Sequence, residues 1–220
     1  MLNRLPSVLI TLLLLWGSSA TGQIKSEQAN AYLEQLKEHV LVVRLPSQSK
    51  KIGALAALME KEDLSTQERE RAKLQWETTK AEAKAEALII QASVSNYFDY
   101  APVLFMYDNA SPKLTKGERT GFFLDKNLEI SDAILENDPF FILDVGYTDP
   151  SNSARSFSFI IKDQSYQALP APFPYAQRIN TPALAFDQLL GRNSMEKYYR
   201  KAVIRLNKRL HRTASRTPNP

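Results

Sequence analysis

Two charged residues interrupt apolar segments that otherwise have the pattern of buried β-strands. Arg44 lies in VLVVRLP, and Asp144 lies in FFILDVGY. A charge that is buried alone is strongly destabilising, so each residue needs an opposite charge or contact with water at a strand end. We expect the two strands to be neighbours in one sheet. Their charged side chains would then either pair with each other, which is the simpler structural interpretation, or line one cleft at the edge of the sheet.

A third charged residue, Asp108, directly follows the apolar segment VLFMY. Two carboxylates on either side of a substrate can act as general acid and as base or nucleophile, so a hydrolase built on acidic residues at strand ends is one alternative. Convergence of Arg44, Asp108 and Asp144 in one deep pocket would favour this enzyme. Burial of Arg44 and Asp144 as a pair with no cavity would favour a binding protein.

Other catalytic groups are scarce in this sequence. The chain has no Cys, and its two histidines, His39 and His211, stand beside no serine or cysteine motif. Neither G-x-S-x-G nor H-E-x-x-H occurs, and no spacing of His and Cys suggests a metal site. We therefore predict no catalytic residue, no metal ligand and no cofactor, and the balance favours a protein that is not an enzyme.

The stretch VLVVRLPSQSKKIGALAAL resembles a strand, loop and helix that could hold a phosphate. A phosphate-binding loop needs glycines whose backbone N–H groups close around the anion, but the one glycine here, Gly53, follows the lysines. A nucleotide site is therefore not expected. Ser47 or Ser49 is expected to cap the helix, and Lys50 and Lys51 at an exposed helix start could attract an anion weakly.

The segment LPAPFPYAQR contains three prolines at intervals of two residues. Such a segment is extended and stiff, and its aromatic side chains point to alternate sides. It could present an aromatic recognition edge, with Tyr175 and Arg178 as candidate binding residues. The simpler interpretation is that it covers an edge of the sheet.

The last predicted helix, from about Ser194 to Arg212, combines an apolar stripe with a basic outer face. The stripe comprises Met195, Tyr199, Ala202, Val203, Leu206 and Leu210, and the basic face comprises Lys197, Arg200, Lys201, Arg205, Lys208 and Arg212. The stripe should pack on the core. The basic face could meet lipid head groups, an envelope polymer or an acidic protein patch, so membrane-surface association is a second alternative function, with Arg200, Lys201, Arg205 and Lys208 as candidate binding residues.

The N-terminal sequence MLNRLPSVLITLLLLWGSSATGQ has the layout of a secretory signal peptide over residues 1–22, with cleavage near Ala20 or Gly22. Its apolar run is far shorter than the roughly 20 residues that span a bilayer, so no transmembrane span is expected after cleavage. We expect a periplasmic or secreted protein. From Arg192 onward the chain has nine Lys or Arg residues and one acidic residue, a charge that nucleic acid would complement. Export from the cytoplasm argues against nucleic acid as a partner.

Hydrophobic periodicity predicts a single α/β domain over residues 23–212, with α+β as an alternative, and a disordered tail over 213–220. Helices are expected over 26–39, 50–62, 66–97 and 181–190, the third starting at a capping box formed by Ser65 and Glu68. Strands are expected over 40–45, 103–107, 140–147 and 156–161, with two short ones in 121–130 and a turn at 149–153. This order indicates a mixed sheet of about 4–6 strands with flanking helices, a thioredoxin-like order of elements, and one long helix or helical hairpin.

Several segments together resemble a family of exported, uncharacterised proteins of Gram-negative bacteria. These segments are VLVVRLPSQSKKIGAL, NYFDYAPVLFMYD, FFLDKNLEI, SFSFIIKDQSYQALPAPFPYAQR and RKAVIRLNKRLHR. The resemblance covers most of the mature chain and implies a periplasmic or secreted location, but no activity. We expect a binding or structural accessory protein whose partner is an envelope protein or an anionic envelope surface.

Overall fold

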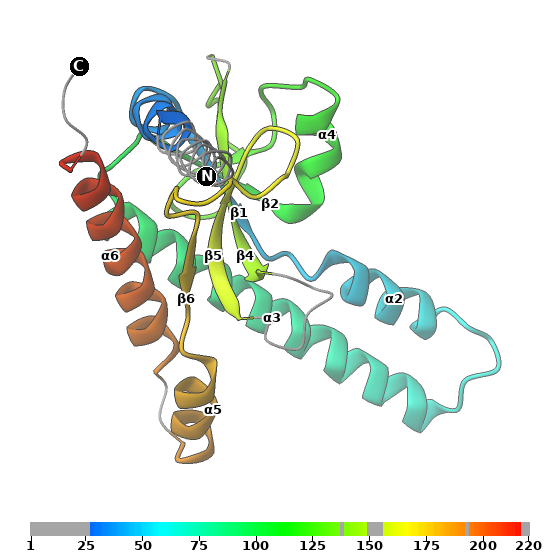
Figure 1. The fold of residues 1–220 in the computed structure, drawn as a ribbon. Coiled ribbons are helices and arrows are strands. Elements are labelled where there is room, and N and C mark those ends of the chain that lie inside the picture. Colours follow the sequence, from blue (N-terminus) through cyan, green and yellow to red (C-terminus); the bar gives the residue numbers. More distant parts are fainter. Residues whose placement is uncertain (1–26, 137–138, 149–155, 192–193, 217–220) are drawn as a thin grey trace, which may run out of the picture.

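A six-stranded mixed sheet forms the centre of the protein, with helices on both of its faces (Figure 1). The computed structural model describes residues 27–136, 139–148, 156–191 and 194–216. The predicted signal peptide and the predicted turn at 149–153 lie outside these residues. The α/β class with a mixed sheet and flanking helices is confirmed, whereas the thioredoxin-like order of elements is not.

The strands follow the order β3-β2-β1-β4-β5-β6 across the sheet. Their bounds are β1 (Leu41–Leu45), β2 (Val103–Tyr107), β3 (Phe123–Leu124), β4 (Phe141–Tyr147), β5 (Phe157–Lys162) and β6 (Ala176–Arg178). β1 is central and parallel to both β2 and β4, and the other pairings are antiparallel. The proline-rich segment leads into β6, so it covers an edge of the sheet as its simpler interpretation predicted.

Within the described residues, the helices are an N-terminal helix over residues 27–38 and five further α-helices. These are α2 (Ser49–Met59), α3 (Thr66–Tyr97), α4 (Ser111–Thr115), α5 (Thr181–Leu189) and α6 (Met195–Ala214), and the 3-10 turn η1 (Asp108–Ala110) precedes α4. The sequence did not predict α4, because a helix of five residues is too short to show a hydrophobic period. None of the helices in the described part of the chain is long and apolar enough to cross a membrane.

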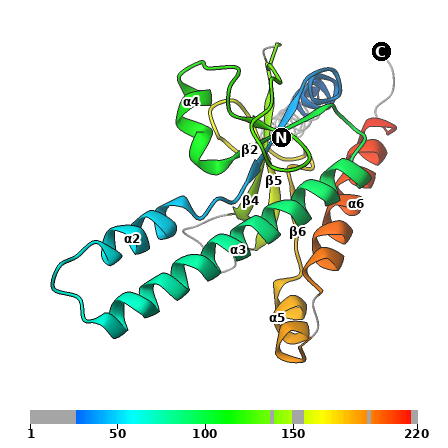
Figure 2. The same ribbon diagram turned by 180° about the vertical axis from the view of Figure 1, so that it is seen from behind.

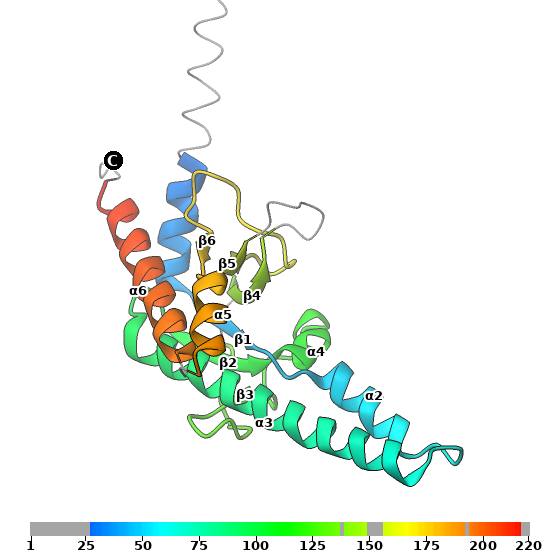
Figure 3. The ribbon, with the colours of Figure 1, turned by 90° about the horizontal axis from the view of Figure 1, so that it is seen from below.

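The long helix α3 begins where the capping box predicts. The Ser65 side chain accepts a hydrogen bond from the Glu68 backbone N–H, and the Glu68 carboxylate accepts one from the Ser65 backbone N–H. The charged first half of α3 packs against α2, and the two helices form a hairpin that projects beyond the sheet (Figures 2 and 3). The predicted long helix is confirmed, since α3 is a single helix of 32 residues.

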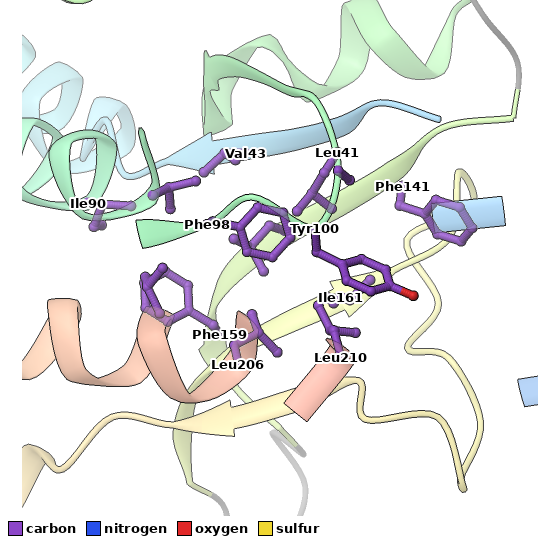
Figure 4. Packing of buried hydrophobic residues seen from close by; sticks show 14 of the residues in the cluster. Leu41, Val43, Ile90, Phe98, Tyr100, Phe141, Phe159, Ile161, Leu206 and Leu210 are labelled. Atoms are coloured by element: carbon purple, nitrogen blue, oxygen red, sulfur yellow. The ribbon is translucent and has the colours of Figure 1, made fainter. Parts of the chain in front are cut away.

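The larger core cluster lies on one face of the sheet, under the N-terminal helix, α3 and α6. Odd-numbered strand residues such as Val43, Leu143 and Phe159 are fully buried or nearly so there. Figure 4 shows side chains from the sheet, α3 and α6 in one layer, with Phe98 and Tyr100 between them. The apolar stripe of α6 is therefore a core face, as its regularity predicts.

A smaller core cluster lies on the opposite face of the sheet, where Val42, Met106 and Ile142 meet Leu114 of α4. Because both faces are covered, β5 is more buried than its sequence SFSFII suggests. The alternation of polar and apolar residues in SFSFII predicts a half-exposed strand, but the central residues Ser158–Ile161 are all buried, so that prediction is wrong. The buried Ser158 hydroxyl stays satisfied by hydrogen bonding to Ser156.

Candidate functional site

The carboxyl ends of three parallel strands meet at a point where the chain changes direction across the sheet. From β1 the chain reaches β2 through α2 and α3, and α3 packs on the face that carries the larger core cluster. From β2 it reaches β4, on the other side of β1, through α4 on the opposite face. In open α/β sheets, such a topological switch point opens a crevice at the carboxyl ends of the strands, where ligands bind.

Arg44 and Asp144 form an ion pair at this switch point. Val43 of β1 lies opposite Leu143 of β4, which brings the next residue of each strand together. The Arg44 Nη1 lies 2.8 Å from the Asp144 Oδ1, and the Lys162 Nζ of β5 lies 2.7 Å from the Asp144 Oδ2. All three side chains are about one-fifth exposed. The predicted pairing of these neighbouring strands through two opposite charges is confirmed.

Two further residues fix the Arg44 guanidinium. Its Nε donates a hydrogen bond to the Ser111 Oγ at 2.9 Å, and its Cζ lies 5.3 Å from the centre of the Tyr166 ring. The Ser111 hydroxyl in turn donates to the Asp108 carbonyl oxygen at 2.7 Å. Arg44 is therefore held by a carboxylate, a hydroxyl and an aromatic ring from three different elements of the chain.

Asp108 joins the loop after β1 to the end of β2. Its Oδ1 accepts hydrogen bonds from the Ser47 backbone N–H, at 3.1 Å, and from the Ser47 hydroxyl. Together with Arg44 and Asp144, Asp108 lines an open pocket of about 370 Å³. The structure therefore shows both a half-buried ion pair and a cavity beside it, a combination that neither sequence expectation anticipated.

A second open pocket, of about 690 Å³, adjoins the first. Arg44, Pro46, Gln48 and Asp108 line both pockets, so we treat the two as one site and name it the switch-point cleft. The second pocket adds hydroxyl, amide and ammonium groups to the lining: Ser49, Lys50, Lys51, Asn109 and Ser111. Most of the residues that line the cleft beside α2 and α4 are thus polar or charged.

The first turn of α2 forms one wall of the switch-point cleft. Neither serine caps this helix as expected: the cap residue is Gln48, in the left-handed region at φ 52, and its side chain makes no capping hydrogen bond. The Ser47 hydroxyl donates to Asp108, and its oxygen accepts a hydrogen bond from the Ser49 backbone N–H at 3.2 Å. The N–H groups of Lys50 and Lys51, next in the turn, have no intrahelical acceptor, and no acidic residue lies in this turn. These two N–H groups and the positive dipole end of α2 are therefore available to an anion.

The wall formed by α3 contributes an acidic residue, Glu86, whose Oε1 accepts a hydrogen bond from the Tyr199 hydroxyl. Burial and the nearby Glu86 charge raise the pKa of Tyr199 well above its ordinary value. Tyr199 therefore stays protonated and remains a hydrogen-bond donor to Glu86 across the whole neutral range. This bond ties the cleft to α6 through the core.

The remaining predicted binding residues lie away from the switch-point cleft. Tyr175 packs partly buried against the larger core cluster, and Arg178 lies exposed in the edge strand β6. The basic candidates Arg200, Lys201, Arg205 and Lys208 belong to α6, and none of them lines either pocket of the cleft. The predicted residues thus separate into a group at the cleft, two residues in or next to β6, and a group on α6.

Within the described part of the chain, no cluster of His, Asp or Glu could hold a metal ion. Comparison of the chain with protein-family models, with curated proteins and with solved structures finds no match. The geometry of the cleft and the charges around it are therefore what a functional proposal can rest on.

Proposed function

We propose that this protein is an exported binding protein of the cell envelope, without enzymatic activity, that holds an anionic ligand in the switch-point cleft. Periplasmic or secreted location is part of the proposal and rests on the signal-peptide pattern of residues 1–22. The observation that carries the ligand assignment is the set of cations at the mouth of the cleft.

The acidic residues of the cleft already have partners inside the protein. Asp144 contacts Arg44 and Lys162, Asp108 accepts from Ser47, and Glu86 accepts from Tyr199. Lys50 and Lys51, by contrast, are exposed and form no ion pair with any residue that the structure describes. An anion in the cleft would meet these two ammonium groups and the N-terminus of α2 together, which favours carboxylate-rich or phosphate-bearing ligands.

A hydrolase is the second candidate, because Arg44, Asp108 and Asp144 line one pocket. Binding is favoured over hydrolysis because a carboxylate that acts as base or nucleophile needs an oxygen free to meet the substrate. Each Asp144 oxygen already contacts a cation. Turnover of chromogenic glycosides or esters that is lost in Asp108→Asn, with the variant still folded, would reverse this preference.

Calorimetric titration of the chain from Gln23 to Pro220 tests the proposal, with citrate and inorganic phosphate as probes. That chain keeps both core clusters. We expect saturable binding of at least one probe, weakened about tenfold or more in Lys50→Gln/Lys51→Gln, because each lost charge-assisted contact contributes about 1.5–3 kcal/mol. Lys37→Gln/Lys73→Gln, which removes two exposed charges elsewhere, is the matched control.

Equal binding by the two double variants would show that the cleft is not where the anion binds. If neither citrate nor phosphate binds at low salt, an anionic ligand is excluded, since contacts between opposite charges are strongest at low salt.

A further inference from the structure

Helix α5 carries an apolar stripe that faces away from the protein. Pro182, Ala185, Phe186 and Leu189 recur at intervals of three and four residues, which places them on one side of a helix. All four are exposed, Phe186 to 61% and Leu189 to 85%. A surface helix ordinarily turns such a stripe toward the core, so this orientation is the reverse of the usual one.

The orientation of α5 is fixed by a polar contact on its inner side. Asp187 is buried, its Oδ2 accepts a hydrogen bond from the Tyr198 hydroxyl at 3.0 Å, and the Lys197 Nζ lies 3.9 Å away. Both partners belong to the first turn of α6. Figures 1 and 2 show α5 beyond the end of the sheet, beside this start of α6. Because Asp187 faces inward, the apolar stripe must face outward.

A stripe of cations begins where α5 meets α6. Lys197, Lys201, Arg205, Lys208 and Arg212 follow one another at intervals of three or four residues along α6, and all five are exposed. Apart from the distant contact of Lys197 with Asp187, these five make no ion pair with a described residue. The opposite side of α6 is fully occupied by the core, so this stripe is free to meet an external surface.

We propose that α5 and the basic stripe of α6 together dock the protein on an anionic lipid surface. The side chains of Phe186 and Leu189 enter the boundary between head groups and acyl chains, and the five cations of α6 contact the anionic head groups. The binding goes beyond the function proposed for the switch-point cleft and does not depend on it.

Charge complementarity selects a lipid surface over a second copy of the chain as the occupant. Two copies related by a two-fold axis would bring the same basic stripe against itself and repel each other. An anionic bilayer instead attracts each cation near its surface and accepts apolar side chains beneath its head groups. Weak apolar insertion combined with a polybasic patch is the two-signal arrangement that gives stable attachment.

Co-sedimentation of the chain from Gln23 to Pro220 with vesicles tests this inference. Phosphatidylglycerol-containing vesicles are compared with pure phosphatidylcholine vesicles at low salt. We expect the unaltered chain to bind the anionic vesicles alone. Partitioning should be about 100-fold weaker for Lys201→Gln/Arg205→Gln/Lys208→Gln, which loses three cations. It should be at least tenfold weaker for Phe186→Gln/Leu189→Gln, which loses the two apolar side chains. Lys37→Gln/Lys73→Gln/Lys116→Gln is the matched charge control and should bind as the unaltered chain does.

Several outcomes would overturn the inference. Equal loss in the two triple variants would show a nonspecific charge effect, and an unaltered partition coefficient in Phe186→Gln/Leu189→Gln would show that α5 does not insert. A dimer in solution that this α5 variant dissociates, with no vesicle binding, would assign the stripe to a second copy. Circular dichroism of each variant shows whether it is folded, and because these side chains are exposed no loss of fold is expected.

Discussion

Asp144 holds two cations, Arg44 and Lys162, in the middle of β4. Replacement by Asn keeps the shape of the side chain and removes its charge. Both cations would then remain in a half-buried place without a counter-charge. Breaking a buried pair in this way costs about 3–5 kcal/mol when burial is complete, and less where solvent reaches the charges.

We therefore expect Asp144→Asn to lower the free energy of unfolding by about 2 kcal/mol, as measured by urea denaturation. Asp132→Asn, the same exchange at an exposed position, is the control and should change it by less than about 0.5 kcal/mol. Equal stability of the two variants would mean that the pair contributes nothing to the fold.

Asp99 provides a residue-scale test of pH dependence. Hydrogen bonds from His211, at 2.7 Å, and from Asn207, at 2.8 Å, hold the pKa of Asp99 below its ordinary value of 3.8. The pKa of Asp99 is lower in the folded chain than in the unfolded chain. Ionised Asp99 therefore stabilises the fold at pH values above its unfolded-state pKa, and this stabilisation is lost as the pH falls through its folded-state pKa.

Asp99→Asn should thus destabilise the protein slightly at neutral pH, by less than about 1 kcal/mol because the site is exposed. The difference in the free energy of unfolding between Asp99→Asn and the unaltered chain should become smaller as the pH is lowered below 3.8. Urea denaturation at a series of pH values measures this. A difference that stays constant through the acidic range would contradict the assignment.

At the scale of elements, the sequence predicts well where a local signal is strong. The capping box places the start of α3 at Thr66, and the β-branched run places β1 within one residue. The start of α2 was harder to predict, because Ser47 bonds both to Asp108, distant in sequence, and to the Ser49 N–H, while Gln48 in the left-handed region occupies the cap position. α4 shows no period at all over five residues.

The capping box makes a direct element-scale prediction. Ser65→Ala removes the side chain that satisfies the Glu68 backbone N–H and should lower the free energy of unfolding by about 1 kcal/mol. Ser95→Ala, the same exchange at an exposed position inside α3, should change it far less. Thermal or urea unfolding compares the two, and an equal effect would show that the cap does not stabilise the hairpin.

Helix α2 is the element expected to open most readily. It has no buried residue, whereas β1 and β4 lie at the centre of the sheet, with four of the five residues of β1 and the first three residues of β4 buried. Amide hydrogen exchange should therefore be faster in α2 than in either strand, since local opening exposes little apolar surface. Protection of α2 equal to that of β1 would contradict this, and would mean that the hairpin unfolds with the sheet.

At the scale of the whole molecule, the charges that we assign to ligand and lipid binding lie in two places: the switch-point cleft, and the outer side of α6. Arg44, Asp108 and Asp144 could be predicted as one group because a charge in an apolar strand needs a partner. Ser111, Lys162 and Tyr166 could not, because the path of the chain between β2 and β5 decides whether they meet Arg44. The outward stripe of α5 was likewise hidden, since a periodic pattern does not show which side faces solvent.

The claim that the switch-point cleft binds an anion is tested most directly by an NMR titration with citrate, which locates the ligand on the chain. We expect the backbone amide signals from Gln48 to Ile52 to shift first, and these shifts to vanish in Lys50→Gln/Lys51→Gln. Shifts confined to α6, or shifts at Gln48–Ile52 that persist in the double variant, would contradict it.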